Sequence, residues 1–249
     1  MFPLLYHAHH TLHMEDLPFW EEMARQQGDP ILELGCGTGR LLLPLMKMGY
    51  RVIGLDRDLD MLAFLRRTLP AELQPQVCIF QADMAAFSLA DTFRTEIFRL
   101  IFLPCNTLST LTRPVLRGML AGVRRHLDPK GAFVASLPNP AILLAMPTRG
   151  ESEVEEIFLH PLTGNPVQVS STWRRSSRGF NLWWMYDHLL PDGQVQRTTL
   201  EVKHELRPPE VYLEEFYLAG LKPAALYGDY DFSAYTPESQ YLILVANLA

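Results

Sequence analysis

The chain has 249 residues, enough for one large domain or for one domain with a sizeable insertion. Hydrophobic residues make up 48% of it, so a packed core is available without disulfide bonds. The formal net charge of -6 argues against a protein that binds nucleic-acid backbones, because such a protein needs a basic face.

The amino terminus and the cysteines indicate a cytoplasmic protein. The first residues lack the positively charged region of a signal peptide, and apolar runs stay shorter than the roughly 18 residues of a membrane span. Cys36, Cys78 and Cys105 are widely spaced and form no CxxC pair, which is typical of free thiols. We therefore expect neither a metal centre nor a membrane span.

Strands and helices alternate along the first half of the chain. A helix capped by Asp16 comes first and ends at Gly28. Apolar strands are then predicted at 31–34, 51–55, 76–81, 100–103 and 132–137, with helices at 40–48, 59–69 and 114–127. The last of these helices is expected to end in the turn 128–131. The alternation predicts a mostly parallel sheet with right-handed crossovers.

The pattern changes after Pro140. Residues 154–207 read as successive strands joined by turns, and the last of them alternates between a face with Leu200 and His204 and a charged face. This alternation predicts an antiparallel sheet with one solvated face. A helix from Pro208 to about Leu221 and strands at 224–227 and 241–246 close the chain.

We therefore divide the chain into three parts. Residues 1–28 form an N-terminal lid and first helix, 29–140 with 208–249 form the core, and 141–207 form the inserted antiparallel sheet.

The most informative motif is a glycine loop that leaves the first core strand. Gly35, Gly37 and Gly39 follow a G-x-G-x-G spacing, and such glycines allow positive φ angles and close approach of a ligand. A dinucleotide fingerprint has its third glycine one residue later, and Glu33 would repel a pyrophosphate. An acid at Glu33 instead suits a ligand with a cationic amine, although a tight turn without a ligand remains an alternative.

Two more acids stand at the ends of the next strands. Asp56 lies about twenty residues past the loop, where an acid can accept hydrogen bonds from both ribose hydroxyls. Asp83 ends the third strand and can accept from an adenine amino group, beside the apolar Met84. Because ligands of open α/β sheets bind at the carboxyl ends of strands, three acids there predict one ligand site.

With these motifs, the sequence resembles the class I S-adenosylmethionine-dependent methyltransferases. The resemblance runs from about Tyr6 to the C-terminus and is strongest at 31–40, 52–58 and 81–84. It implies an α/β, Rossmann-like, seven-stranded sheet, mostly parallel with an antiparallel last strand. The inserted antiparallel sheet resembles the roof of small-molecule methyltransferases, including amino-sugar and glycine N-methyltransferases. The implied cofactor is S-adenosyl-L-methionine.

The resemblance also implies which residues bind the cofactor. They are Tyr6, Glu33, Gly35, Cys36, Gly37, Gly39, Asp56, Arg57, Met61, Asp83, Met84 and Leu103. Tyr6 matches an N-terminal tyrosine that closes over the cofactor in related enzymes. Two features depart from the family's pattern. Arg99 stands where the family often has an acid, and histidines follow Tyr6 in place of a common arginine.

The acceptor site is expected between the fourth strand and the inserted sheet. Asn106 could orient the acceptor, and Trp173, Trp184 and Tyr186 could form an aromatic lining, or simply pack within the sheet. His188 and His10 are candidate bases because histidine titrates near neutral pH. The histidines at 7, 9, 10 and 13 have no common zinc spacing and read as part of a solvated lid.

The sequence thus predicts a methyltransferase that acts on N or O of a small molecule by in-line displacement. The partners expected are a small-molecule acceptor and, through the inserted sheet, a second copy of the chain. The alternatives are a non-catalytic interaction protein that keeps the fold, and an NAD-dependent oxidoreductase, which the glycine spacing disfavours.

Overall fold

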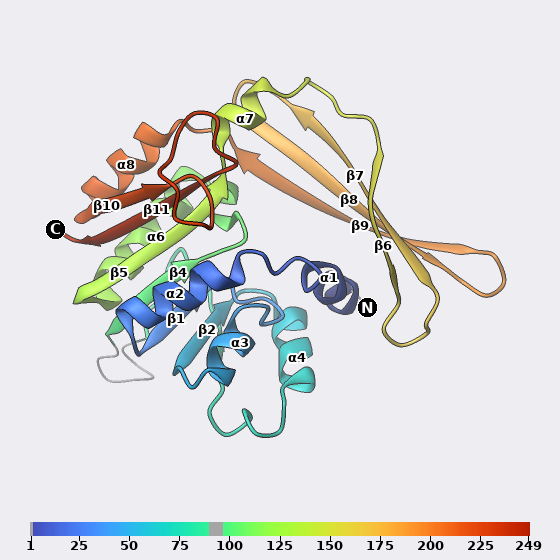
Figure 1. Ribbon diagram of the computed structural model, residues 1–249, viewed down its shortest axis with the longest axis horizontal. Helices are drawn as coiled ribbons and strands as arrows, with labels where there is room; N and C mark the ends of the chain where they lie inside the picture. Colours follow the sequence, from blue (N-terminus) through green and yellow to red (C-terminus); the bar gives the residue numbers. More distant parts are fainter. Residues whose placement is uncertain (1, 90–96) are drawn as a thin grey trace.

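A computed structural model describes residues 2–89 and 97–249 of the chain as two sheets with helices around the larger one (Figure 1). The larger sheet has seven strands in the order β10-β11-β5-β4-β1-β2-β3. They are β1 (Ile31–Leu34), β2 (Val52–Asp56), β3 (Cys78–Gln81), β4 (Phe98–Leu103), β5 (Leu127–Pro138), β10 (Leu221–Tyr227) and β11 (Tyr241–Leu248).

The strand directions confirm the predicted fold class. The pairs β1–β2, β1–β4, β2–β3 and β4–β5 are parallel, whereas β11 is antiparallel to both of its neighbours, β5 and β10. The carboxyl ends of β1, β2, β3 and β4 therefore lie along one edge of the sheet, where the sequence predicts the ligand site.

Helices cover both faces of this sheet. They are α2 (Leu17–Gln27), α3 (Leu42–Lys47), α4 (Leu59–Thr68), α6 (Arg113–His126) and α8 (Pro209–Leu218). Side chains of a strand alternate, so Leu32 of β1 joins the apolar cluster of α6 and α8, and Ile31 joins that of α2, α3 and α4. The described helices are too short or too polar to cross a bilayer.

The smaller sheet, which we call the roof, has the antiparallel order β6-β7-β8-β9. Its strands are β6 (Glu153–Leu159), β7 (Pro166–Arg175), β8 (Gly179–Leu189) and β9 (Val195–Glu205). The cross-strand pairs Trp184↔Leu200 and Phe180↔His204 share the face that looks back toward the core. The short helix α7 (Pro140–Ala145) leads from β5 into the roof.

The structure corrects two local expectations. Residues 128–131 belong to the start of β5 rather than to a separate turn, and the irregular pairing there is a register shift opposite Phe98 and Leu100. The N-terminal segment, expected only as a lid, forms the helix α1 (Phe2–His10). Leu5 buries this helix in a third apolar cluster with Val167, Val169 and Tyr186 of the roof. Tertiary packing thus stabilises a helix whose first turn has no acidic residue.

Candidate functional site

One cavity of about 1280 Å³ lies where the core, the roof and α1 meet. Gly35 and Gly37 line it from the loop after β1, Asp56 from the end of β2, and Asp83 from the residues after β3. Trp184 lines it from the roof. In Figure 1, α1 lies between α4 and the roof strands, so this helix bridges the two halves of the site.

The glycine loop adopts the conformation that its sequence predicts. Gly35, Gly37 and Gly39 have φ angles of 71°, 51° and 83°, in the region that favours glycine. The Gly37 amide donates to Oδ2 of Asp56 at 2.8 Å, which ties the loop to the end of β2. Gly39 faces α3 and α4 instead of the cavity, so its role is to pack the loop against these helices.

We expect Gly39→Ala to lower the free energy of unfolding by about 2 kcal/mol, through left-handed strain and overpacking. A Cβ at this position would stand 2.6 Å from Cδ1 of Leu65 and 3.2 Å from Cγ of Leu43. Gly49→Ala is the matched control, because Gly49 also has a positive φ but nothing within 4 Å of its added Cβ. Urea unfolding measures both variants, and equal losses would contradict the packing argument.

The two acids at the strand ends are fixed by backbone amides. Asp56 accepts from Gly37 through Oδ2, and from the Asp58 amide through Oδ1 at 2.9 Å. Asp83 accepts from the Ala85 amide through Oδ1 at 2.9 Å. Each carboxylate oxygen has two lone pairs, so these carboxylates can still accept hydrogen bonds from a ligand in the cavity.

The helix α1 is attached to both halves of the site by histidines. Nδ1 of His7 lies 3.0 Å from Oγ1 of Thr38 in the glycine loop. Nδ1 of His9 lies 3.0 Å from the hydroxyl of Tyr186 in the roof. Among the described residues, no three His, Cys, Asp or Glu side chains gather as a metal site requires. The contacts of His7 and His9 thus join α1 to the glycine loop and to the roof.

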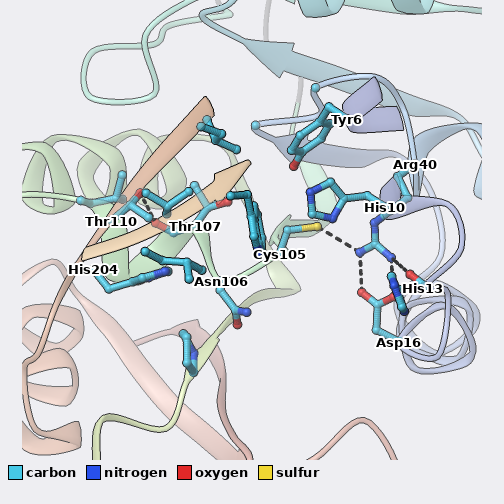
Figure 2. Close-up of a pocket in the computed structure, with 18 of the residues that line it drawn as sticks. Tyr6, His10, His13, Asp16, Arg40, Cys105, Asn106, Thr107, Thr110 and His204 are labelled. Carbon is cyan, nitrogen blue, oxygen red and sulfur yellow. Dashed lines mark hydrogen bonds and ion pairs between the residues drawn. The ribbon is translucent and has the colours of Figure 1, made fainter. Parts of the chain in front are cut away.

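An ion pair under α1 connects three segments of the chain (Figure 2). The Arg40 guanidinium binds both Asp16 oxygens at 2.6 Å, and also donates to the His13 carbonyl and to Sγ of Cys105 at 3.0 Å. The side chains of Arg40 and Asp16 are only 12% and 10% exposed, so little solvent screens this pair. Arg40 holds the residues after α1 against the glycine loop and the end of β4.

The end of β9 contributes a polar group that sequence reasoning missed, His204, which contacts Ser109 in the segment after β4. Ser109 donates its hydroxyl hydrogen to the Asn106 carbonyl at 2.8 Å, so it accepts the hydrogen bond from Nδ1 of His204 at 2.8 Å. Because Nδ1 carries the proton, Nε2 of this neutral ring is a hydrogen-bond acceptor. His204 and Asn106 both line the cavity, and Asn106 has a left-handed φ of 60°.

The stability of the fold should depend on the protonation of His204. Burial lowers the pKa of His204 from 6.5 to about 4, so in this range only the unfolded chain takes up the proton. The contribution is complete above pH 6.5 and is lost as the pH falls toward 4. From pH 7 to pH 5, we expect wild type to lose roughly 1 to 2 kcal/mol more than His204→Gln in urea unfolding. Parallel losses would contradict this linkage.

Several predicted site residues lie behind the cavity wall. Glu33 is buried, and the loss of hydration raises the pKa of its carboxyl well above the usual range. Cys36 packs against Gly54, and the side chain of Leu103 is buried below Gly35. These positions support the glycine loop from beneath. The role of the Leu103 carbonyl remains a prediction.

The predicted roof residues fall into two groups, those that line the cavity and those that pack away from it. Trp184 lines the cavity, whereas Trp173 packs over Gly150 and Tyr186 is fully buried against α1. His188 stacks on His160, with ring centroids 4.2 Å apart, and Nε2 of His188 contacts Oγ1 of Thr163 at 3.0 Å. This position separates His188 from the cavity, and the candidate base on the cavity wall is His10. The other apolar roof residues on the cavity wall are Phe180, Leu182, Leu200 and Val202.

The charged side chains that line the cavity are mostly acidic. Arg40 and Arg57 are its arginines, and Arg40 is neutralised by Asp16. The acidic lining residues are Glu15, Asp16, Asp56, Asp58, Asp83, Glu155, Asp229 and Asp231. Such a wall attracts cationic ligands and disfavours additional negative charge.

Comparisons with known proteins point to a methyltransferase domain. A family model described as a methyltransferase domain matches residues 31–131. Ribosomal RNA small subunit methyltransferase A of Anaeromyxobacter dehalogenans is 42% identical over 62 residues. This match covers 25% of the chain and only 20% of that relative.

Solved structures resemble the chain over nearly its whole length. The CcbJ methyltransferase from Streptomyces caelestis has a TM-score of 0.77 at 19% identity, covering 94% of this chain and 95% of that one. CalS10, an amino pentose methyltransferase from Micromonospora echinaspora solved with S-adenosylmethionine bound, has a TM-score of 0.69 at 22% identity, covering 95% and 91%. These comparisons confirm the methyltransferase fold and support S-adenosylmethionine as the cofactor.

Proposed function

We propose, from the premise that the chain carries a methyltransferase domain on the fold of S-adenosylmethionine-dependent methyltransferases, that it methylates N or O of a small molecule. One observation carries this proposal. A single cavity contains both the strand ends that would hold the cofactor, which we call the cradle, and a space under the roof that would hold the acceptor. We further propose the division into 1–28, 29–140 with 208–249, and 141–207, and a cytoplasmic location, where Cys36, Cys78 and Cys105 would remain free thiols.

The cradle fits the proposed cofactor. Gly35 and Gly37 present backbone without a Cβ to the cavity, and Asp56 offers lone pairs to ribose hydroxyls. Asp83 and Met84 suit the amino edge and the face of adenine. When bound, S-adenosylmethionine supplies an electrophilic methyl group on a sulfonium. The chain's own residues orient the acceptor and exclude water, while the acidic wall favours the cationic cofactor over a neutral product.

The acceptor space supports a neutral or cationic substrate. Trp184, Leu182 and Leu200 form an apolar ceiling, and His204 with Asn106 offers polar groups at one end. Because Arg40 is occupied by Asp16, a phosphorylated acceptor finds little compensation among these residues. We therefore favour an amine or a hydroxyl on an apolar body without phosphate.

Two measurements test the function. Equilibrium binding of labelled S-adenosylmethionine tests the cofactor, and a lack of binding by the folded wild-type protein would contradict the proposal. A library of small amines, alcohols and their phosphorylated counterparts, screened for release of S-adenosylhomocysteine, tests the acceptor. Turnover of phosphorylated compounds alone would contradict the acceptor class, and absence of turnover with intact cofactor binding would favour the non-catalytic alternative.

The oxidoreductase alternative has a test of its own. A thermal shift with NAD but none with S-adenosylmethionine would favour the oxidoreductase alternative.

The face of the roof that points away from the cavity exposes Val154, Ile157 and Leu159 by 57%, 60% and 66%. We propose that a second copy of the chain covers this face. Light scattering tests the homodimer. The wild-type protein should be a dimer, and Ile157→Glu should dissociate it into monomers.

A further inference from the structure

The order of the strands gives the cofactor a direction in the cavity, if the proposed function holds. The neighbours β4, β1, β2 and β3 follow one another across the sheet. With adenine at Asp83 beyond β3 and ribose at Asp56 of β2, the methionine portion extends toward β1 and β4. Gly35 and Cys105 stand at those two strand ends and line the cavity.

The methionine portion ends in a carboxylate that needs hydrogen-bond donors in this otherwise acidic cavity. Arg40 is the arginine at this end, but both terminal nitrogens of its guanidinium are already used. Nη1 donates to Asp16 and the His13 carbonyl, and Nη2 donates to Asp16 and Sγ of Cys105. With its charge balanced by Asp16, Arg40 is a poor anchor for a second carboxylate.

His10 has a ring nitrogen left without a partner at the same place. Its Nε2 is buried and has no hydrogen-bond partner among the described residues, although the side chain lines the cavity. The ring lies 4.0 Å from that of Tyr6 and 5.2 Å from that of Trp184, measured between centroids, which fixes it in place. Figure 2 shows it between Tyr6 and the contact of Arg40 with Cys105. A buried polar atom without a partner is costly unless a ligand satisfies it.

The surroundings of His10 are compatible with an anion. Burial and the neighbouring Arg40 and His9 lower the pKa of His10 to about 3, so it is a neutral ring with one N–H near pH 7. At the end of α1, the His7 and His9 carbonyls accept hydrogen bonds from the Thr11 and Leu12 amides, so these two carbonyls are not free to face the ligand. Burial raises the pKa of Glu33, a buried acid close to Arg40, well above its usual range, which favours its uncharged form.

We propose that Nε2 of His10 donates a hydrogen bond to the carboxylate of the cofactor's methionine portion. This inference rests on the proposed function and assigns His10 to cofactor recognition, in place of a role as a base for the acceptor. The contact attaches α1 to the end of the cofactor farthest from adenine.

The test compares two ligands that differ in this portion. S-adenosylhomocysteine carries the amino acid, whereas 5′-methylthioadenosine keeps only the nucleoside and a methylthio group. In isothermal titration calorimetry, we expect His10→Ala to weaken S-adenosylhomocysteine about tenfold or more, because hydrogen bonds to charged groups are among the strong ones. The affinity for 5′-methylthioadenosine should stay within about twofold, since no carboxylate is involved.

Two further variants make the result specific. His10→Gln places an amide N–H near the same position and should restore part of the preference for S-adenosylhomocysteine. His13→Ala is the matched control, because His13 also lines the cavity but its side chain is half-exposed. It should bind both ligands as wild type does.

The possible outcomes distinguish the role of His10 from the proposed function. Equal weakening of both ligands by His10→Ala would mean that His10 only packs α1, and unchanged binding would mean that the carboxylate binds elsewhere. Either result overturns the proposal for His10 while leaving the cofactor assignment intact. Failure of the folded wild-type protein to bind both ligands would overturn the proposed function itself.

Discussion

Replacing Asp56 with alanine should weaken binding of S-adenosylmethionine about 100-fold, because two ribose hydroxyls would lose their acceptor. The substitution also removes the acceptor of the Gly37 amide at 2.8 Å and of the Asp58 amide at 2.9 Å. The glycine loop would therefore lose its attachment to β2 at the same time. Equilibrium dialysis with labelled cofactor measures the change.

The control for this effect is Asp60→Ala. Asp60 lies in the first turn of α4, is exposed, and contributes its backbone amide, not its carboxylate, to the cap formed by Asp58. Its loss removes one negative charge a short distance from the cavity but no ligand contact. A similar loss of affinity in Asp60→Ala would show that net charge, and not the Asp56 contacts, determines binding.

Arg40→Met should lower the free energy of unfolding by about 3 kcal/mol, because it leaves a buried carboxylate without its cation. Asp16 would keep only the hydrogen bond from Nε1 of Trp20 at 3.0 Å. The residues after α1 would also lose their contact with the loop after β4, since Arg40 joins the His13 carbonyl to Cys105. Guanidinium unfolding followed by circular dichroism measures the loss.

Arg25→Met provides a matched comparison at the surface. Arg25 also makes a two-pronged contact, with Glu22, but it is 69% exposed, so its loss should cost far less stability than the loss of Arg40. The double variant Arg40→Met with Asp16→Asn should recover part of the stability, because no buried charge is left unpaired. If Arg40→Met cost no more than Arg25→Met, burial would not strengthen this ion pair.

The sequence was sufficient for the sheet and for the wall of the cavity formed by strand ends. Parallel strands place their carboxyl ends on one edge, so Gly35, Asp56 and Asp83 could be brought together without coordinates. Contacts between segments that are distant in the chain leave no such pattern in the sequence. Arg40 and Asp16 are 24 residues apart, and neither periodicity nor spacing relates them.

The choice between His188 and His204 shows a second limit of prediction from the sequence. His188 and His204 point to the same face of adjacent strands, as the alternation of side chains indicates. The antiparallel register places His204 opposite Phe180, at the start of β8, and His188 opposite Gln196, near its far end. Only the first of these ends is close to the core, and the register could have pointed to His204 once the hairpin turn was located.

The double attachment of α1 couples the two halves of the cavity mechanically. A helix bonded through His7 to the glycine loop and through His9 to the roof cannot leave one half without disturbing its contacts to the other. Trp184, which borders the acceptor space, also touches the rings of both His9 and His10. A displacement of α1 on the glycine-loop side would therefore also move side chains that pack against Trp184 on the roof side.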